Sequence, residues 1–321
     1  MNYAFVTAVQ NDLSAVDDLV RANLNSQVPL VEEIASYLVE AGGKRLRPML
    51  VLLSARACGY QGSDHITLAT IIEFLHTAML LHDDVVDESD LRRGRKTVNS
   101  AWGNAASVLV GDFLHSRAFE MMVEIGDIRI MEILARATNI ISEGEVQQLS
   151  AIGNPSITEA EYREIITRKT AMLFQAASHS GAVLAGAERA IESELRDFGL
   201  NLGIAFQLID DQLDYRGETE SLGKNTGDDL AESKVTLPLI IAMQEGSEKQ
   251  RAYIARAIKE GGVENLPTVL DIVEQTGALD YTLEAAKLAG CHARGNLQSV
   301  PESKYAEAMS ALIAFVVDRH Y

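Results

Sequence analysis

The sequence predicts an all-α protein that folds as one large domain. Apolar residues recur every three to four positions along nearly the whole chain, which is the pattern of helices with one buried face. Ala, Leu, Glu and Arg, which favour helix, are frequent, and no segment alternates apolar and polar residues for long. With 47% apolar residues among 321, the chain can form a sizeable core. We expect one domain over residues 1–321.

The periodicity sets the expected helices, and local signals support their ends. They span residues 4–24, 30–40, 48–58, 66–87, 101–125, 127–150, 158–186, 190–215, 235–245, 248–260, 263–275, 277–297 and 302–319. Pro48 suits a first helical turn, and Thr158 with the acids after it suits an N-cap. The breaks at 59–65, 152–156, 216–229 and 261–262 are too short to link separate domains.

Composition excludes several classes of protein. The chain holds 28 Lys and Arg against 46 Asp and Glu, a net charge of −18, which argues against nucleic-acid binding. Cys58 and Cys291 match no metal or redox spacing, which excludes a disulfide framework and fits a reducing compartment. The N-terminus is acidic rather than signal-like, and apolar runs such as 49–53 fall far short of about 20 residues. We therefore expect a cytoplasmic protein without stable membrane insertion.

The pattern Asp-Asp-x-x-Asp occurs twice, 127 residues apart, each time at the end of an apolar helical run. The two acidic segments consist of Asp83, Asp84 and Asp87, and of Asp210, Asp211 and Asp214. Positions i and i+4 lie about 40° apart on a helix, so the outer carboxylates of each segment share a face. Carboxylates on one face repel unless a cation lies among them, and Mg²⁺ prefers such oxygen ligands.

A single acidic cluster could equally be a solvated helix end in so acidic a chain. Two copies are harder to explain that way, because acids near a helix C-terminus oppose the macrodipole at about 0.3–1 kcal/mol each. An unfavourable local choice made twice indicates function.

Basic residues gather in two short segments. GGKRLRP (42–48) holds Lys44, Arg45 and Arg47, and RRGRK (92–96) holds Arg92, Arg93, Arg95 and Lys96. Arg forks chelate phosphate oxygens and Lys supplies a point charge, whereas the alternative is a basic loop that balances nearby acids. Acidic and basic segments together indicate two anionic groups, one held through Mg²⁺ and one held directly.

Other polar residues could line the same site as the acidic and basic segments, although each of them alone could be structural. His76 lies on the face of Asp83, and Gln207 precedes Asp211 by one turn. Lys169 and Thr170 form a polar pair within REIITRKTAMLF, and Lys224 and Lys234 flank the loop after the second acidic segment.

With these motifs the sequence resembles the trans-polyprenyl diphosphate synthases. GGKRLRP, HDDVVDESDLRRG, EGEVQQL, RKTAMLF, FQLIDDQLDY and GKNTGDDLAESKVTLPL carry the resemblance, in this order, over nearly the whole chain. It is closest to the bacterial long-chain type, octaprenyl diphosphate synthase among them. The resemblance implies an isoprenoid synthase fold, a helical bundle around a deep central cavity with the two acidic segments facing each other at its mouth. It also implies a homodimer.

The resemblance implies roles for individual residues. The six Asp residues of the two acidic segments would bind Mg²⁺, three ions per site with substrate bound. The catalytic residues would be Asp83, Asp84, Asp87, Lys169, Asp210 and Asp211. Isopentenyl diphosphate would be held by Lys44, Arg47, His76 and Arg93. The allylic diphosphate would be held by Arg92, Lys169, Thr170, Gln207, Lys224 and Lys234.

The same resemblance implies that the length of the product depends on cavity depth. The positions four and five before the first acidic segment are Met79 and Ala78, and neither is aromatic. Leu75, Phe119, Met121 and Met122 are candidates for the floor, so we expect a C40 product, with C45 next. The end of the chain, VVDRHY, carries only Arg319 and His320 as basic residues and gives little support for a basic tail that closes the site.

The expected activity is Mg²⁺-dependent elongation of an allylic primer, such as farnesyl diphosphate, for quinone side chains such as that of ubiquinone. Three alternatives stay open from the residues. A non-catalytic subunit of a heteromeric synthase would lose motif residues, and these are intact here. A terpene cyclase would not need Lys44, Arg47 and Arg93. A shorter-chain synthase (C20–C30) differs only in the depth of the cavity.

Overall fold

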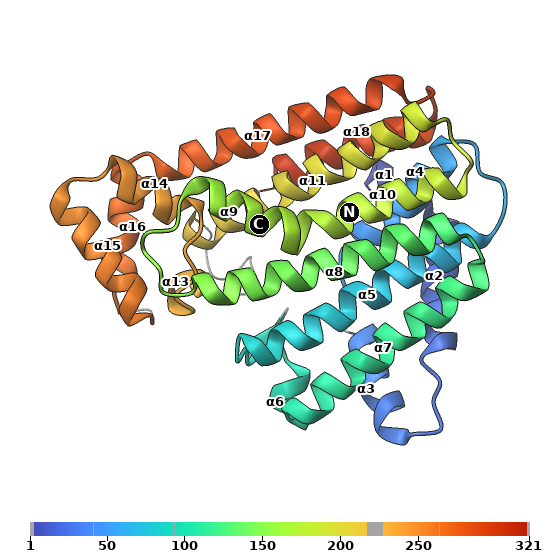
Figure 1. Ribbon diagram of the computed structural model, residues 1–321, viewed down its shortest axis with the longest axis horizontal. Helices are drawn as coiled ribbons and strands as arrows, with labels where there is room; N and C mark the ends of the chain where they lie inside the picture. The colour runs from blue at the N-terminus through green and yellow to red at the C-terminus, as the bar shows by residue number, and fades with distance from the viewer. Residues whose placement is uncertain (1–2, 41, 93, 217–226, 263, 320–321) are drawn as a thin grey trace. The chain divides into compact units, whose positions relative to one another are not determined.

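Helices make up almost all the secondary structure of the computed structural model (Figure 1). It describes residues 3–40, 42–92, 94–216, 227–262 and 264–319. The helices are α1 (Ala4–Ala8), α2 (Gln10–Asn23), α3 (Pro29–Glu40), α4 (Leu46–Ala57), α5 (Asp64–Val86), α6 (Val98–Trp102), α7 (Asn104–Ile125), α8 (Ile128–Ala151), α9 (Glu159–Ile166), α10 (Met172–Leu184), α11 (Arg189–Arg216), α13 (Asp228–Ala231), α14 (Leu237–Glu245), α15 (Glu248–Glu260), α16 (Leu266–Gln275), α17 (Ala278–Asn296) and α18 (Lys304–Val317). The prediction of an all-α protein is confirmed.

The local signals at the helix starts are also confirmed. Thr158 is the N-cap of α9 and forms a capping box: its hydroxyl accepts from the Glu161 N–H at 3.3 Å, and the Glu161 carboxylate accepts from the Thr158 N–H at 2.8 Å. Pro48 lies in the first turn of α4. Its missing N–H costs nothing there, because first-turn donors have no partner within the helix.

Three of the expected helices are interrupted, for local backbone reasons. The helix expected at 4–24 breaks at Val9, whose φ is −127°. The helix expected at 101–125 is interrupted at Gly103, whose φ of 88° suits glycine and which separates α6 from α7. Within the helix expected at 158–186, a π-helical turn, η1 (Thr167–Ala171), joins α9 to α10. A π-turn inside a helix often marks a functional site.

A small hairpin corrects the expectation that no strands form. β1 (Leu91–Arg92) pairs antiparallel with β2 (Arg95–Lys96), with Leu91 opposite Lys96 and Arg92 opposite Arg95. Two-residue strands are too short to show an alternating pattern, so the sequence carries no signal for them. The hairpin follows directly on α5, and its first strand carries Arg92.

The chain divides into two compact units, each described here by itself. Unit 1 comprises Met1–Thr138, Leu173–Gly199 and Asn296–Leu312, and unit 2 comprises Asn139–Met172, Leu200–Gly295 and Ile313–Tyr321. The first acidic segment belongs to unit 1 and the second to unit 2. The single domain and the deep central cavity stay predictions.

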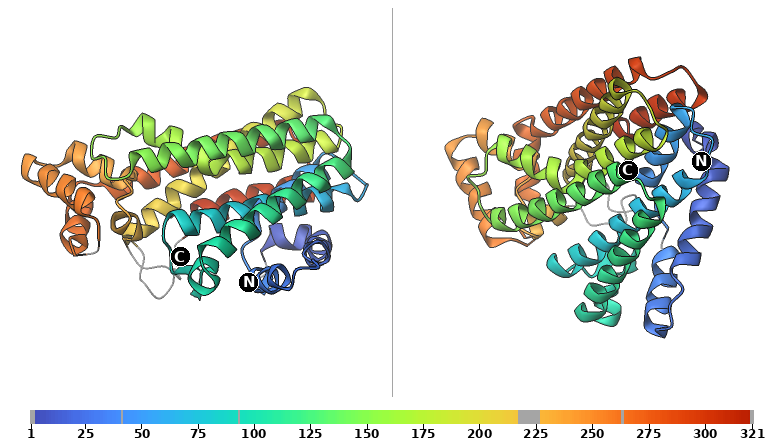
Figure 2. Two further views of the ribbon diagram at one scale, coloured as in Figure 1. Left: turned by 60° about the horizontal axis from the view of Figure 1, so that its bottom comes forward. Right: turned by 45° about the vertical axis from the view of Figure 1, so that its right-hand side comes forward.

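The core of unit 1 forms around α4 and α5. Leu50, Val51, Leu52 and Leu53 of α4 are fully buried, so this helix is covered on every side. α5 lies along α7 in both views of Figure 2. Gly181 of α10 permits the close approach of α4, since a Cβ there would lie 2.7 Å from the Val51 carbonyl oxygen. This packing fixes the axis of α5, whose end carries the first acidic segment.

The core of unit 2 lies beneath the second acidic segment. Leu208, Ile209 and Leu213 of α11 are buried in one cluster with apolar residues of α14, α15 and α16. These apolar positions bracket Asp210 and Asp211 along the same helix. The burial of one face of α11 therefore sets where its carboxylates lie.

Among the residues that the structure describes, one helix is long and apolar enough to cross a membrane, contrary to the expectation from the sequence. This is α5, at a mean hydropathy of 1.2, and 56% of the apolar window is buried inside the protein. A buried core helix of a soluble protein passes the same test, so the finding is weak evidence for a membrane span.

Candidate active site

The first acidic segment lies at the C-terminal end of α5. Asp83 and Asp84 belong to the last turn, and Asp87 is the C-cap residue, whose N–H donates to the Asp83 carbonyl at 2.8 Å. That turn carries no basic side chain, so the three carboxylates lie where the helix dipole is already negative. Asp84 is 4% exposed, whereas Asp83 and Asp87 are partly exposed. The segment offers two accessible carboxylates beside a buried one.

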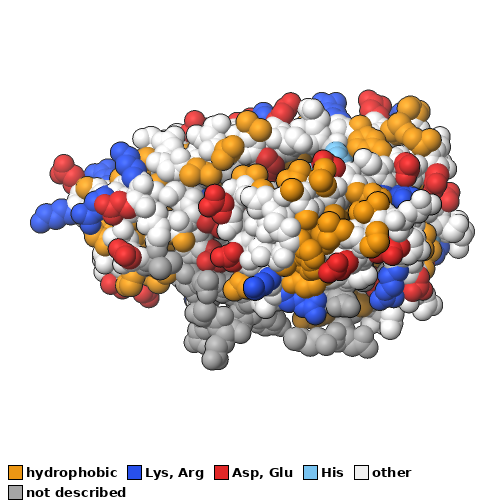
Figure 3. All heavy atoms as spheres, turned by 90° about the horizontal axis from the view of Figure 1, so that it is seen from below, with side chains coloured by type: hydrophobic (Ala, Val, Ile, Leu, Met, Phe, Trp, Pro, Cys, Tyr) orange, Lys and Arg blue, Asp and Glu red, His pale blue; other side chains and the backbone are white. Residues whose placement is uncertain are grey.

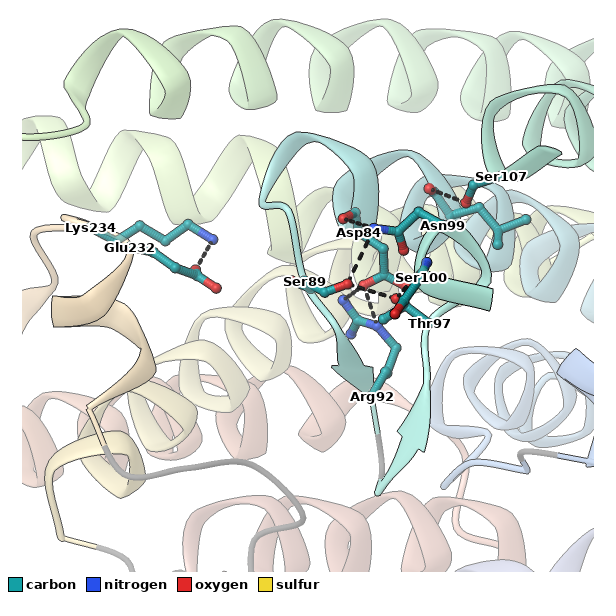
Figure 4. Close-up of polar contacts among 10 residues, drawn as sticks. Asp84, Ser89, Arg92, Thr97, Asn99, Ser100, Ser107, Glu232 and Lys234 are labelled. Carbon is teal, nitrogen blue, oxygen red and sulfur yellow. Dashed lines mark hydrogen bonds and ion pairs between the residues drawn. The ribbon is translucent and has the colours of Figure 1, made fainter. Parts of the chain in front are cut away.

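Arg92 of β1 anchors the buried carboxylate, as Figure 4 shows. Its Nε and Nη2 both donate to Asp84 Oδ1, at 2.8 and 2.6 Å. Burial raises the pKa of the Asp84 carboxyl, the hydrogen bonds and charge of Arg92 oppose that rise, and the neighbouring carboxylates Asp83 and Asp87 add to it. The guanidinium thus provides the countercharge that a buried carboxylate requires.

Polar contacts hold the hairpin against the end of α5 (Figure 4). Asn99 Nδ2 donates to the carbonyls of Asp84 and Ser89, at 3.0 and 3.2 Å. The Thr97 hydroxyl donates to the Ser89 carbonyl at 2.6 Å. Asn99 and Thr97 were not expected to take part. They are ordinary polar residues in sequence, and only the fold brings them to this helix end.

Arg47 and His76, both predicted to hold isopentenyl diphosphate, lie together. Arg47 Nη1 is 3.0 Å from His76 Nε2, and the guanidinium lies 4.5 Å from the centre of the Phe174 ring. Lys44 precedes α4 and is exposed. Arg93, the fourth predicted member, lies outside the described residues.

Arg45, between Lys44 and Arg47, is used differently. It caps the start of α4 with a left-handed backbone (φ 49°) and pairs with Glu73 and, at 3.6 Å, with Asp17. GGKRLRP is therefore not a uniform anion site, because one of its cations neutralises acids of unit 1.

Asp211 is the buried member of the second acidic segment and belongs to a chain of hydrogen bonds. Gln207 Nε2 donates to Asp211 Oδ1 at 2.7 Å, and the Thr170 hydroxyl donates to Gln207 Oε1 at 2.8 Å. The Tyr162 hydroxyl also donates to Asp211, and burial, with the charge of Asp211 second, raises the Tyr162 pKa well above its usual value. Thr170 and Gln207 were predicted site residues, and the structure connects them. Tyr162 was missed, because it resembles any buried aromatic residue in sequence.

Asp210 and Asp214 have other partners. Asp214 Oδ2 accepts from the Asp229 N–H at 3.3 Å. Asp210 forms an ion pair with Arg319, whose guanidinium lies 4.8 Å from the centre of the Phe206 ring. The Arg319 side chain is only 6% exposed, and burial lowers its pKa to about 10. The expectation of little support for a basic tail is corrected, since one basic residue of that tail reaches the second acidic segment.

The predicted lysines are placed as follows. Lys169 Nζ donates to Glu145 Oε2 at 2.5 Å and to Gln148 Oε1 at 2.7 Å, both on α8. Lys234 Nζ lies 2.6 Å from Glu232 Oε2 (Figure 4). Lys224 lies outside the described residues.

A pocket in unit 1 reaches the first acidic segment. Its polar wall includes His76, Asp84 and Arg92, together with Arg45, Arg95 and Lys96. Its apolar wall comes from α2 with its C-cap residue and from α3, α5, α6 and α7. It consists of Val20, Leu24, Ala35, Leu38, Phe74, Leu80, Leu81, Val98 and Leu114. A charged end and an apolar body meet in this one pocket.

The residues predicted to set chain length are distributed between core and surface. Leu75, Ala78 and Met122 are buried, and Met79 is partly exposed. Phe119 is 37% exposed on α7 and contacts the ring of His115. The ring of Phe119 is thus partly open to solvent, and its role at the floor of a cavity stays a prediction.

Metal ligands are present, but not as a ready-made cage. Among the residues that the structure describes, no group of three or more His, Cys, Asp or Glu could hold a metal ion. Mg²⁺ needs no such cage, since it typically takes one or two carboxylates plus water and substrate phosphate. Asp83 and Asp87, and in unit 2 Asp210 and Asp214, are partly exposed oxygen donors of the right kind. They fit a divalent cation that binds together with a phosphate.

A family model described as polyprenyl synthetase matches residues 28–274, which is most of the chain. This chain belongs to the polyprenyl synthetase family. The resemblance inferred from the motifs is confirmed.

Individual relatives agree with this family assignment. This polyprenyl synthetase is 49% identical to an octaprenyl diphosphate synthase of Haemophilus influenzae, over 97% of this chain and 94% of that protein. It is 46% identical to an all-trans-nonaprenyl-diphosphate synthase (geranyl-diphosphate specific) of Rhodobacter capsulatus, over 97% and 96%. A crystal structure of a polyprenyl synthase from Caulobacter crescentus, complexed with calcium and isoprenyl diphosphate, matches with a TM-score of 0.96 at 45% identity, over 99% and 98%. The chain is thus a prenyltransferase with the isoprenoid synthase fold.

Replacing Arg92→Gln in this polyprenyl synthetase should lower the free energy of unfolding by about 1–3 kcal/mol at neutral pH, because Asp84 stays buried without its countercharge. The Asp84 pKa then rises further above its ordinary value of 3.8, so the folded state holds a proton that the unfolded state has lost. The destabilisation should therefore shrink as the pH falls from about 7 towards about 4. Urea unfolding at several pH values measures it.

The double variant Asp84→Asn with Arg92→Gln is the control, since it removes the buried charge as well. It should recover most of the lost stability, and its deficit should be independent of pH over the same range. A pH-independent loss in the single variant would contradict the assigned pairing.

Proposed function

We propose that this enzyme lengthens an allylic diphosphate by successive trans condensations with isopentenyl diphosphate, in the presence of Mg²⁺. Farnesyl diphosphate is the primer and a C40 prenyl diphosphate the product that we favour, with C45 next. One observation carries the proposal: the pocket of unit 1 places Asp84, Arg92 and His76 beside an apolar wall. Such a pocket suits a molecule with an anionic head and a hydrocarbon tail.

The names of the relatives support the chain length. The octaprenyl and nonaprenyl synthases match over nearly their whole length, at 49% and 46% identity. Neither Ala78 nor Met79 is bulky enough to resemble the aromatic stop expected of a short-chain enzyme. The geranyl preference in the name of the second relative makes geranyl diphosphate the alternative primer.

The charges of the described side chains explain why such a reaction would proceed here. Diphosphate leaves poorly until its charge is neutralised, and bound Mg²⁺, which we propose to be three ions per site, supplies that neutralisation. Asp83 and Asp87 in unit 1 would hold ions, and so would Asp210 and Asp214 in unit 2. One unit-charge pair at about 4 Å contributes about 4 kcal/mol at an effective dielectric constant of about 20, before desolvation.

Lys169 and Arg92 would contact the diphosphate oxygens directly. The allylic C–O bond breaks with its electron pair on the diphosphate, and the double bond of isopentenyl diphosphate attacks the cation. A proton then leaves for the departed diphosphate and the new double bond forms. Lys44, Arg47 and His76 would orient the attacking molecule, and the apolar wall would exclude water that quenches the cation.

We also propose that the enzyme is a homodimer joined through α7. Val108, Leu109, Phe119 and Val123 are exposed by 37–66%, and on an ideal helix they fall within an arc of about 100°. Figure 3 shows hydrophobic side chains gathered on one face of the molecule. Exposed apolar patches of this kind mark association sites.

Leu109→Glu should shift the sedimentation coefficient from that of a dimer to that of a monomer. An unchanged dimer, or a monomeric wild type, would contradict this interface.

The remaining proposals concern the cell. We propose a cytoplasmic enzyme that binds no nucleic acid and inserts into no membrane, and whose product becomes the side chain of a quinone such as ubiquinone. The net charge of −18 supports the absence of nucleic-acid binding, since a negatively charged protein repels nucleic acid. Cell fractionation tests the compartment, and the quinone tail length in cells that lack the protein tests the product's use.

Purified protein with farnesyl diphosphate, labelled isopentenyl diphosphate and Mg²⁺ should give a product that chromatographs as C40 after dephosphorylation. Chelation of the metal should abolish turnover. A C20–C30 product would establish a shorter-chain synthase, and no turnover without an added partner protein would indicate a subunit of a heteromeric synthase.

Asp83→Asn should lower turnover at least about 100-fold, because one oxygen ligand loses its charge where the leaving group is stabilised. Asp90→Asn, an exposed acid three residues beyond the segment, is the matched control and should stay within about twofold. Equal activity of the two variants would contradict the role assigned to the first acidic segment.

A further inference from the structure

The EGEVQQL run at 143–149 has no role so far, yet almost every polar member of it contacts the π-turn η1 or the helix before it. Glu143 Oε2 lies 3.5 Å from Arg168 Nη1, and Gln147 Nε2 donates to Glu164 at 3.3 Å. Glu145 and Gln148 both accept from the Lys169 ammonium. This part of α8 is therefore built around the turn that carries Lys169.

Gly144 shows how close that approach is. A Cβ at Gly144 would lie 2.8 Å from the Lys169 backbone nitrogen and 2.8 Å from Arg168 Cβ. The backbone of α8 thus lies directly against η1, which is possible because this position lacks a side chain. Glu145 and Gln148, three residues apart on one helical face, then reach Lys169 from a fixed distance.

The π-turn separates two neighbouring side chains. Lys169 bonds to α8, whereas the Thr170 hydroxyl bonds to Gln207 of α11, which in turn bonds to Asp211. Two of the residues expected to contact the allylic diphosphate are thereby held by two different helices. The contacts of Thr170 involve neutral groups, and only Lys169 has a carboxylate partner among the bonds described for this pair.

An ammonium on a flexible four-carbon stem needs such a partner to hold one position. The side chains of Lys169 and Glu145 are 18% and 29% exposed, so their contact at 2.5 Å is partly shielded from water. Charge-assisted hydrogen bonds of this kind are stronger than neutral ones.

We infer that Glu145, assisted by Gln148, is a positioning residue that holds the Lys169 ammonium in place for the diphosphate of the allylic substrate. The inference rests on the proposed function for the identity of that substrate. Glu145 does not touch the substrate and acts only through Lys169. Its removal therefore has no further effect once Lys169 is gone, whereas a merely structural contact would weaken the protein regardless of Lys169.

The test is a double-mutant cycle on the full-length protein, read out as the affinity for inorganic diphosphate in excess Mg²⁺ by calorimetry. Glu145→Gln should weaken binding about tenfold, because coupled neighbours show effects of this size. Lys169→Met should weaken it at least as much, and the double variant should bind no more weakly than Lys169→Met alone. Glu143→Gln is the matched control: it neutralises an acid two residues away that pairs with Arg168, and it should change the affinity less than twofold.

The inference would be overturned if the fold-losses in diphosphate affinity of the two single variants multiplied in the double variant. Wild-type affinity in Glu145→Gln would overturn it as well. If Glu145→Gln fails to fold, Gln148→Ala takes its place in the cycle. Gln148→Ala should weaken diphosphate binding by less than about tenfold, and it should cause no further weakening when it is combined with Lys169→Met. A wild type that binds diphosphate and shows the coupling but makes no prenyl product overturns the proposed function and leaves the positioning role standing. A wild type that does not bind diphosphate overturns both.

Discussion

A carboxylate taken out of water must be met by a cation or by hydrogen-bond donors, and this requirement organises both acidic segments. Asp84 is met by the guanidinium of Arg92, and Asp211 by Gln207 and Tyr162. Since a buried charge is costly when it is left unpaired, removal of these partners would destabilise the folded protein. The middle aspartate of each Asp-Asp-x-x-Asp pattern is thus a structural anchor, and the outer ones are left at the more exposed positions.

Anchoring of the middle aspartate has consequences for the residues around it. Arg92 must come close to the end of α5, which requires the hairpin and the bonds from Asn99 and Thr97. Gln207 must lie one turn before Asp211, and its second contact, Thr170, then lies on a π-turn rather than on a regular helix. Two irregular elements of this helical protein, the hairpin and the π-turn, therefore carry side chains that reach the acidic segments.

Helix periodicity predicted the fold class and nearly all helix positions from sequence, because burial of one face leaves a strong local signal. The Asp-Asp-x-x-Asp repeats and the two basic segments indicated the site, because both the residue types and their spacing can be read from the sequence. Tyr162, Asn99 and Arg319 could not be found this way, since each joins the site through contacts distant in sequence. The hairpin was missed because two-residue strands have no period. The exposed ring of Phe119 depended on tertiary packing that no local pattern encodes.

The cationic partners also bear on how metal would bind. Asp84 and Asp210 are paired with arginines, and no cluster of three or more acidic, His or Cys ligands is ready within the described part of the chain. A divalent cation would therefore need phosphate oxygens to complete its coordination. The direct measurement is the electron paramagnetic resonance signal of free Mn²⁺, titrated with protein in the presence and absence of inorganic diphosphate. We predict that the protein removes Mn²⁺ from solution strongly only when diphosphate is present, beyond what diphosphate binds by itself. Equally strong binding of Mn²⁺ to the protein alone would contradict this account.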